Sequence, residues 1–357
     1  MMVGVNYPWF NYGWDFGDAP PNWRRGREPN WTAHIDQHLA LFVRLGLRVV
    51  RWFILADGLI YGTGSEAPRP DADPARGNEW RFQPGTLNPA FLTHFRALLD
   101  AFQRINQGRD APPLLIMPVF LDFNFCAPGS FPVGRGGSSP VDTGWVKGGR
   151  ADAIVDPAKR GRFLEAVLRP LLRLAHNYRP YIYAWDVINE PEWVTNDWHP
   201  HSRGGHPVGR REMQEFITQS MRMIRGESFK VTVGFNRLET IRSSRIYADY
   251  NQFHYYPQAE QRLVRNPFNP QWPGIIGEFA TSSAQDRWPD LTSARLSQRV
   301  LNRLRFAHRQ GYPLALAWSA HPNGADRHTA WTAEVQQDIE CFTQARNCPP
   351  ASALAGT

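Results

Sequence analysis

Short apolar runs alternate along the chain with longer stretches in which apolar residues recur every three or four positions. A near-continuous apolar run is typical of a strand that is covered on both faces, as in a parallel sheet surrounded by helices. Eight runs of this kind are predicted as strands: residues 3–8, 47–55, 114–125, 181–190, 230–236, 250–256, 274–280 and 313–320.

A helical pattern, or a segment that replaces one, follows each predicted strand. In residues 31–46, Ile35, Leu39 and Phe42 form one apolar stripe, and Gly46 is a typical helix end. Similar patterns occupy residues 88–107, 157–177, 210–225, 238–245, 292–311 and 331–347. This alternation predicts an α/β fold, a (β/α)8 TIM barrel. Since no repeat or boundary interrupts it, we expect a single domain over residues 1–357.

Three connections are long, and each follows the carboxyl end of a predicted strand, which is where barrel enzymes build their sites. They are residues 56–85, 126–156 and 191–209, and they contain the aromatic residues Tyr61, Trp80, Phe131, Trp145, Trp193 and Trp198. Rings beside glycine and proline suit stacking on a flat ligand such as a sugar. The same rings could instead hold the long loops against the barrel.

The chain carries a formal charge of +7, and nearly all of its basic residues are arginine, because lysine occurs only at positions 147, 159 and 230. The arginines are spread along predicted helices rather than gathered in a basic run with interleaved aromatics. This distribution favours solvated helix faces over a nucleic-acid surface. No apolar segment is long enough to span a membrane, so we expect neither nucleic acid nor membrane as a partner.

Three cysteines occur, at positions 126, 341 and 348. They cannot form a disulfide framework, and no CxxC pair suggests a zinc site. Cys341 and Cys348 either pair with each other or remain free thiols. A predicted strand begins at Val3 without a preceding leader, so the chain is either cytoplasmic or a mature form from which a secretory leader was removed.

Two of the apolar runs end in a carboxylate. Glu190 ends the run at 181–190, and Glu278 follows apolar and glycine residues in GIIGEFA. In a barrel both would face the open mouth. Such a pair suits glycoside hydrolysis, in which retaining enzymes hold the two carboxyl groups about 5–5.5 Å apart and inverting enzymes about 6.5–9.5 Å. Two like charges so close would also raise the pKa of one of them.

The triplet Asn189-Glu190-Pro191 on the fourth predicted strand, together with Glu278 on the seventh, resembles the clan A glycoside hydrolases. The nearest resemblance is to the family 5 group of cellulase-like and mannanase-like enzymes. It implies that Glu190 is the acid/base and Glu278 the nucleophile. It also implies that Asn189 hydrogen-bonds the 2-hydroxyl of the sugar.

The resemblance covers the chain from the first predicted strand to the eighth, and further matching positions lie on the second, sixth and eighth. His254 and Tyr256 in FHYYP match a His-x-Tyr motif, in which the tyrosine hydrogen-bonds the nucleophile and the histidine lines the sugar subsite. Arg51 in VVRWF matches an arginine that keeps the nucleophile ionised. Trp318 in LAWSA matches a tryptophan that stacks under the sugar preceding the cleaved bond.

One position departs from the family pattern and leaves the substrate open. The family often has Asp-x-His on the third strand, whereas this chain has Asn124 two residues after Asp122. We predict that Asn124 and Trp193 also contact substrate. For Asp186 we expect a buried pairing with an arginine rather than catalysis, and for Glu192 no role as the acid.

The histidines of WHPHSRGGH, His199, His201 and His206, lie in a loop made pliable by two glycines. Because metal ligation needs fixed geometry, we expect contact with substrate there and no metal. The predicted reaction needs no cofactor.

These observations predict a single-domain retaining glycoside hydrolase that cleaves a β-linked oligosaccharide or polysaccharide, most simply a β-glucan or β-mannan. The long aromatic loops favour endo action, although a loop across one end would make the enzyme exo-acting. A transglycosidase on the same fold, a non-catalytic glycan-binding barrel and a metal-dependent barrel hydrolase are the alternatives. The oligomeric state is not encoded in any of these patterns.

Overall fold

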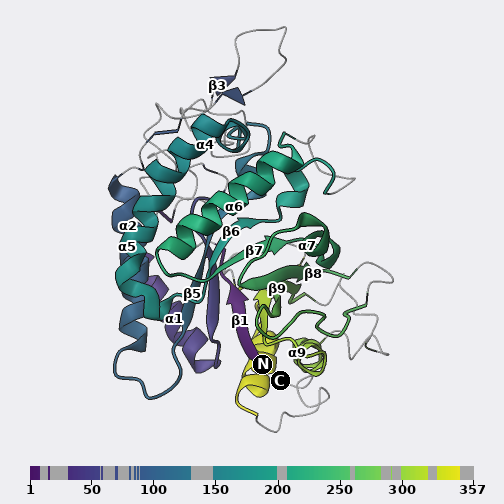
Figure 1. Ribbon diagram of the computed structural model, residues 1–357. Coiled ribbons are helices and arrows are strands. Elements are labelled where there is room, and N and C mark those ends of the chain that lie inside the picture. Colours follow the sequence, from purple (N-terminus) through teal and green to yellow (C-terminus); the bar gives the residue numbers. More distant parts are fainter. Residues whose placement is uncertain are drawn as a thin grey trace, which may run out of the picture.

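The computed structural model describes most of the chain (Figure 1). The described residues are 1–8, 15–16, 31–56, 58, 69–70, 80–81, 84–85, 87, 89–129, 148–198, 207–257, 262–282, 291, 299–320 and 328–345. Much of the three long loops therefore lies outside the described residues. So do several positions that the sequence singled out: Tyr61, Phe131, Trp145, His199, His201 and His206.

Eight parallel strands form a closed barrel in the order β1-β10-β9-β8-β7-β6-β5-β2, which confirms the predicted fold. Seven of the strands lie within their predicted apolar runs, and β1 begins one residue before its run. The strands are β1 Met2–Asn6, β2 Val49–Phe53, β5 Leu115–Asp122, β6 Trp185–Asn189, β7 Val231–Phe235, β8 Tyr250–Tyr255, β9 Gly274–Ala280 and β10 Leu314–Trp318. A separate pair of two-residue strands, β3 Arg69–Pro70 and β4 Trp80–Arg81, lies in the connection after β2.

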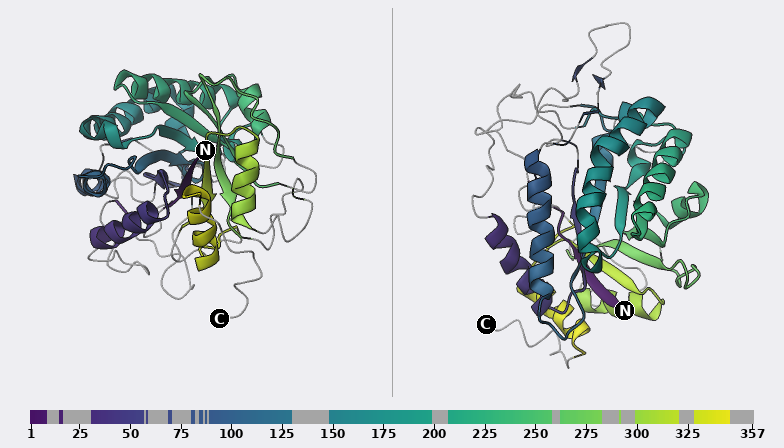
Figure 2. Two further views of the ribbon diagram at one scale, coloured as in Figure 1. Left: turned by 90° about the horizontal axis from the view of Figure 1, so that it is seen from below. Right: turned by 60° about the vertical axis from the view of Figure 1, so that its left-hand side comes forward.

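Helices surround the barrel, as the view from below in Figure 2 shows. They are α1 Trp31–Arg44, α2 Pro89–Asn106, α3 Asp152–Val155, α4 Pro157–Phe163, α5 Arg169–Ala175, α6 Arg210–Gly226, α7 Leu238–Ser244, α9 Val300–Arg309 and α10 Ala333–Thr343. The short 3-10 helices η2 Phe123–Phe125 and η5 Pro191–Val194 follow β5 and β6 at the mouth of the barrel. The predicted alternation of strands and helices is thus present in the described part of the chain except between β8 and β9, where the described residues 262–273 form no helix.

Two boundaries differ from the sequence-based expectation, and proline lies at both. The single helix predicted over 157–177 is divided by a π-helical turn, η3 Leu164–Leu168, and Pro170 follows in the first turn of α5. Proline lacks the N–H that a continuous α-helix requires there. Likewise β6 begins at Trp185 rather than at 181, because the preceding residues form a 3-10 helix, η4 His176–Tyr181, that contains Pro180.

The barrel interior has an apolar floor, which we define as Val49, Met117, Ile275, Leu314 and Leu316. These buried side chains come from four of the strands and fill the end of the barrel away from the mouth. Gly4 on β1 makes room for them, because a Cβ at this position would lie 2.2 Å from Leu316 Cδ2. A second, larger core lies between the strands and the surrounding helices.

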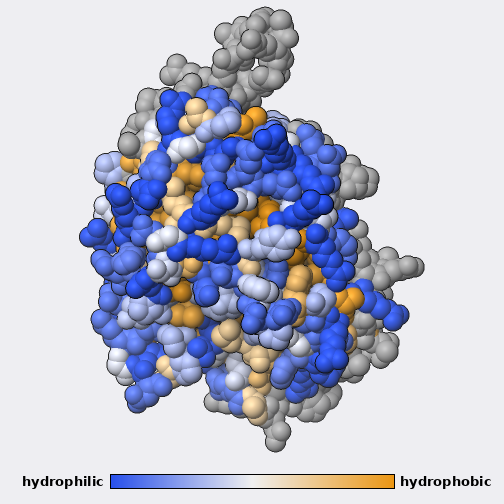
Figure 3. Space-filling view, in the orientation of Figure 1, coloured by the Kyte–Doolittle hydropathy of each residue, from blue (hydrophilic) through white to orange (hydrophobic). Residues whose placement is uncertain are grey.

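The face of the molecule seen in Figure 3 is largely hydrophilic, in keeping with charged residues on the outer sides of the helices. No helix in the described ranges is long and apolar enough to cross a membrane. Cys126 is a free, buried thiol, and Cys341 is disulfide-bonded.

Candidate active site

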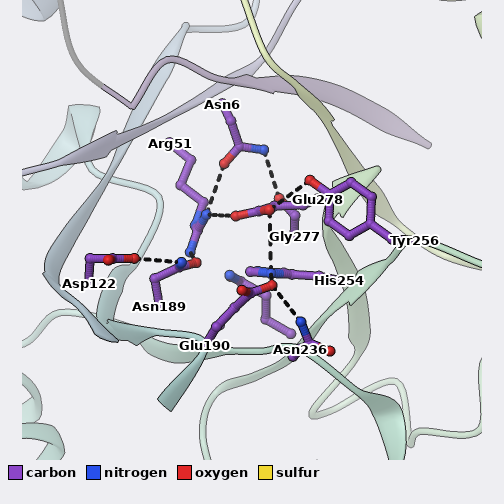
Figure 4. Close-up of polar contacts among 12 residues, drawn as sticks. Asn6, Arg51, Asp122, Asn189, Glu190, Asn236, His254, Tyr256, Gly277 and Glu278 are labelled. Carbon is purple, nitrogen blue, oxygen red and sulfur yellow. Dashed lines mark hydrogen bonds and ion pairs between the residues drawn. The ribbon is translucent and has the colours of Figure 1, made fainter. Parts of the chain in front are cut away.

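Glu278, at the carboxyl end of β9, is held by two donors from other strands. Arg51 Nη1 on β2 donates to Glu278 Oε1 at 2.7 Å, and the hydroxyl of Tyr256, just after β8, donates to Oε2 at 2.8 Å. Figure 4 shows both contacts. The two residues that were predicted to orient Glu278 therefore contact it directly.

Arg51 is completely buried and is the centre of a polar layer just above the apolar floor. Its Nε donates to Asp186 Oδ2 at 2.9 Å, and its Nη1 also donates to Asn6 Oδ1 at 2.9 Å. The expected buried pairing of Asp186 with an arginine is confirmed. Burial alone would lower the pKa of Arg51, but Asp186 and Glu278 outweigh this effect and raise it, so the guanidinium stays charged.

The same arginine orients Asn189 at the end of β6. Arg51 Nη2 donates to Asn189 Oδ1 at 2.7 Å, and Asn189 Nδ2 donates to Asp122 Oδ2 at 2.9 Å. Burial raises the pKa of Asp122 to about 6, against the lowering effect of its hydrogen bonds with Asn124 and Asn189. Asn124 donates to Asp122 Oδ1 through both its backbone N–H and its side-chain amide. It therefore helps to orient the carboxyl group that accepts from Asn189.

Glu190 follows β6 in a left-handed backbone conformation, with φ 45° and ψ 54°. Three neighbours contact its carboxyl group. Trp193 Nε1 donates to Oε2 at 2.7 Å, Asn236 Nδ2 donates to Oε1 at 2.9 Å, and His254 Nδ1 lies 2.7 Å from Oε1. A left-handed conformation is uncommon for a residue with a side chain and costs about 1–3 kcal/mol, so the surrounding structure must enforce it.

The carboxyl groups of Glu190 and Glu278 face each other with His254 beside them (Figure 4). One ligand atom of each of these three residues lies within 4.8 Å of the other two. His254 Nδ1 is also 3.5 Å from Glu278 Oε2. One oxygen of each carboxyl group therefore lies within 4.8 Å of the other, which is nearer to the roughly 5–5.5 Å of retaining glycosidases than to the roughly 6.5–9.5 Å of inverting ones. The three atoms could also hold a divalent cation, although hydrogen bonds already engage both oxygens of Glu190.

The pKa values of the two carboxyl groups shift in opposite directions. Burial alone would raise the pKa of Glu190, but hydrogen bonds from His254 and Trp193 outweigh it and lower the pKa. The pKa of Glu278 is raised, because burial and the charge of Glu190 outweigh His254 and Arg51. His254 itself has a raised pKa, since the two carboxylates outweigh its burial. In this ligand-free site Glu190, His254 and Glu278 therefore titrate as one coupled group.

Solved structures provide the comparison. The chain superposes on a β-1,4-D-mannanase from Cryptopygus antarcticus with a TM-score of 0.64 and 16% identity, over 96% of this chain and 90% of that one. For an endo-1,4-β-mannanase from Eisenia fetida the TM-score is 0.63 with 19% identity, over 97% and 91%. For the β-mannanase of the blue mussel Mytilus edulis it is 0.61 with 17% identity, over 96% and 91%.

The chain has the fold of these mannanases. The resemblance inferred from the motifs is thus confirmed for the (β/α)8 barrel as a whole. No protein-family model and no curated protein matches the chain. With identities below a fifth, these comparisons show the fold alone, and the chemistry of this site must be argued from its own residues.

The remaining predicted substrate residue, Trp318, lies at the end of β10 and is partly exposed. Its ring packs edge-on against Phe53, with centroids 6.3 Å apart, in an apolar cluster with Ala56 and Val119. Trp198, another tryptophan of the long loops, is buried against Phe235 and therefore holds its loop against the barrel. All nine predicted site residues are described; Arg51 lies in the middle of β2, and the others lie toward the carboxyl ends of the strands or in the segments that follow them.

Several residues of the site were missed from the sequence. Asn236 is a polar residue at the end of the fifth apolar run, which is the same signal that identified Glu190, and Asn6 is a polar residue inside the first run. Gln252, which donates to Asp186 at 2.8 Å, carries no such signal because it lies within β8. Gly234 makes room for this layer, since a Cβ there would lie 2.7 Å from Arg51 Nη2.

Proposed function

We propose that the protein is a retaining glycoside hydrolase in which Glu278 is the nucleophile and Glu190 the acid/base. The observation that carries the proposal is the approach of these two carboxyl groups within about 5 Å, with Arg51 and Tyr256 donating to one of them. A pair with this spacing leaves room for a sugar carbon and no room for an additional catalytic water between them.

In the first step an oxygen of Glu278 attacks the anomeric carbon. The glycosidic C–O bond breaks, and Glu190 gives its proton to the departing oxygen. In the second step Glu190 takes a proton from water, the water oxygen attacks the anomeric carbon, and the ester bond to Glu278 breaks. The sugar leaves with its configuration retained, and both carboxyl groups return to their starting states.

The contacts of the two carboxyl groups support this division of roles. Glu278 accepts a hydrogen bond from Arg51, whose charge is permanent, and this favours the ionised form that a nucleophile needs. Glu190 instead contacts His254, which can hold or return a proton through the short Nδ1–Oε1 contact. In the ligand-free site the lowered pKa of Glu190 and the raised pKa of His254 leave this proton on the imidazole. Glu190 acts as the acid after the proton passes to it across the Nδ1–Oε1 contact.

Asn189 would bind the 2-hydroxyl of the sugar, and this bond would strengthen as charge develops at the neighbouring carbon. Its amide is already oriented by Arg51 and Asp122, so little reorganisation is needed on binding. Trp318, Trp193 and Asn124 would line the sugar-binding surface around the reacting centre.

For the substrate we propose a β-1,4-linked mannan cleaved within the chain. The support is the shared fold with mannanases from three animals, one of them named as an endo-1,4-β-mannanase. A β-glucan is the second candidate. It ranks below mannan because the family often has a histidine where this chain has Asn124, and this difference counts against the typical cellulase subgroup.

The test is hydrolysis of a panel of mannans, glucans, xylans and galactans, with products sized over time and their anomeric configuration followed by NMR. We expect oligosaccharides of mixed length from mannan, released first as the β-anomer. Release of single terminal sugars alone would contradict endo action, and release of the α-anomer would contradict retention. Transfer to added acceptor sugars in place of hydrolysis would indicate a transglycosidase, and binding without turnover a glycan-binding protein.

A further inference from the structure

Glu192 lies two residues after the proposed acid/base, in the short helix η5 that begins at Pro191. Its side chain is completely buried, although acidic residues are almost never fully buried unless they are paired. None of the proposed chemical steps uses it. A carboxyl group in this position has to be explained by what it contacts.

Its contacts lie on the connection between β7 and α7. Glu192 Oε1 accepts from the backbone N–H of Arg237 at 3.3 Å, and the backbone N–H of Asn236 also hydrogen-bonds this carboxyl group. These hydrogen bonds fasten η5 to the segment that follows β7. These two partners are main-chain groups, and the side chain of Thr240 in α7 also hydrogen-bonds the carboxyl group, so Glu192 ties η5 to the β7 connection and to α7.

The segment fastened in this way contacts Glu190 as well. The side chain of Asn236 donates to Glu190 Oε1 at 2.9 Å, while the backbone N–H of Glu190 donates to Gly234 O at 2.6 Å. Glu190 is therefore held by three hydrogen bonds: one from its own backbone N–H to β7, one from Trp193 in η5, and one from Asn236 after β7. Its left-handed conformation is strained, and such strain persists only where neighbouring contacts over-determine it.

We propose that Glu192 is a positioning residue that holds the acid/base Glu190 in its reactive place, by tying η5 to the backbone that carries Asn236. This inference rests on the proposed function. Its effect is exerted through Glu190 and Asn236, and Glu192 itself does not touch the reacting atoms. Without these hydrogen bonds, η5 and the side-chain amide of Asn236 are no longer held at a fixed distance from each other. The Glu190 carboxyl group then moves away from the leaving oxygen.

The chemistry of the buried carboxyl group fits such a role. Burial raises the pKa of Glu192 to about 7, against the lowering effect of the Asn236 backbone N–H, and the nearby charge of Glu190 raises it further. At pH values well below 7 the group is therefore protonated and can serve as a neutral acceptor. A glutamine has the same shape and an acceptor oxygen in the same place, so it should replace this function.

The experiment compares Glu192→Ala, Glu192→Gln and Glu190→Ala on aryl β-glycosides that differ only in the pKa of the leaving phenol. Protonation by Glu190 matters for a poor leaving group and hardly at all for dinitrophenol. A misplaced acid should therefore cost roughly 10–100-fold in kcat/KM on the poor leaving group, with little change on the good one. Glu190→Ala sets the full size of this difference, and Glu192→Gln should restore most of the lost rate.

Ile339→Ala in α10 is the matched control, because Ile339 is fully buried but belongs to the outer core. It should lower thermal stability without any dependence of rate on the leaving group. If Glu192→Ala does not fold, Glu192→Asp provides the test, since it withdraws the carboxyl group from the two N–H groups and should give a smaller loss of the same kind.

Equal losses on both leaving groups, or a Glu192→Gln variant as impaired as Glu192→Ala, would overturn the proposal. Failure of the proposed function looks different: the wild-type protein would then hydrolyse no aryl β-glycoside, or Glu190→Ala would show no dependence on the leaving group.

Discussion

The floor of the barrel and the layer directly above it are built from the same strands but have opposite chemistry. On β2, Val49 belongs to the apolar floor, and Arg51, two residues further along the same face, is the centre of the polar layer. On β9, Ile275 lies in the floor, and Glu278 lies above it after an irregularity in the pairing with β8. Two or three residues along a strand therefore separate a side chain that packs in the floor from one that belongs to the candidate active site.

The difference shows what each layer demands of its residues. Floor side chains need only the right volume, so several apolar residues could serve at each position. The polar layer contains one arginine facing two carboxylates, and each buried group there depends on specific partners. Substitutions in the floor should therefore affect stability alone, whereas those in the layer above should affect catalysis, with or without stability.

The largest effect is expected at Glu278. Glu278→Ala should lower kcat by on the order of 10⁴-fold or more, because no other group can form the glycosyl ester. Added azide should restore part of the rate and give a glycosyl azide of inverted configuration, measured by NMR. Full turnover in this variant would show that the role belongs to another residue.

Next comes Arg51, which tests whether the polar layer also carries stability. Arg51→Met leaves Asp186 and Glu278 buried without their cation and should destabilise the fold by about 3–5 kcal/mol in urea unfolding. Arg51→Lys keeps the charge but cannot reach all four partners, so it should lose less stability while kcat still falls. A fully stable Arg51→Met variant would contradict the view that these groups depend on one another.

Leu314→Ala tests the floor. Removing this buried side chain leaves a cavity and should cost about 2–5 kcal/mol of unfolding free energy. The kcat of the folded protein should not change, because the polar layer keeps its own contacts. A large loss of kcat in a Leu314→Ala protein that is fully folded would mean that the floor also determines the geometry of the site.

The smallest effect concerns the pH dependence of stability. Glu192 has a folded-state pKa of about 7 against an ordinary value of 4.5. A raised carboxyl pKa favours folding below the ordinary value, and this contribution is lost as the pH rises through the folded value. Between about pH 4.5 and 7 the wild type should lose up to about 3 kcal/mol relative to Glu192→Gln, measured by urea unfolding at each pH. Parallel stability curves for the two proteins would contradict the raised pKa.

The sequence predicted the barrel well because each strand is a compact apolar run and a closed parallel barrel is the simplest way to cover eight of them. The pair Glu190 and Glu278 was visible because each interrupts an apolar run at its end. The partners that fix the pair were harder to find. Asn236 and Gln252 meet Glu190 and Asp186 only after the strands align, and Glu192 resembled an ordinary loop residue until the folded chain buried it.

The central claim is that Glu278 forms a covalent bond to the sugar, and trapping tests it most directly. A 2-deoxy-2-fluoro-β-glycoside with a good leaving group slows both steps but the second more, so the ester accumulates. We expect the protein to gain the mass of one fluorosugar, with fragmentation of the digested peptide locating the label on Glu278. A label on any other side chain, or complete hydrolysis of natural substrate with inversion and no label, would contradict the account.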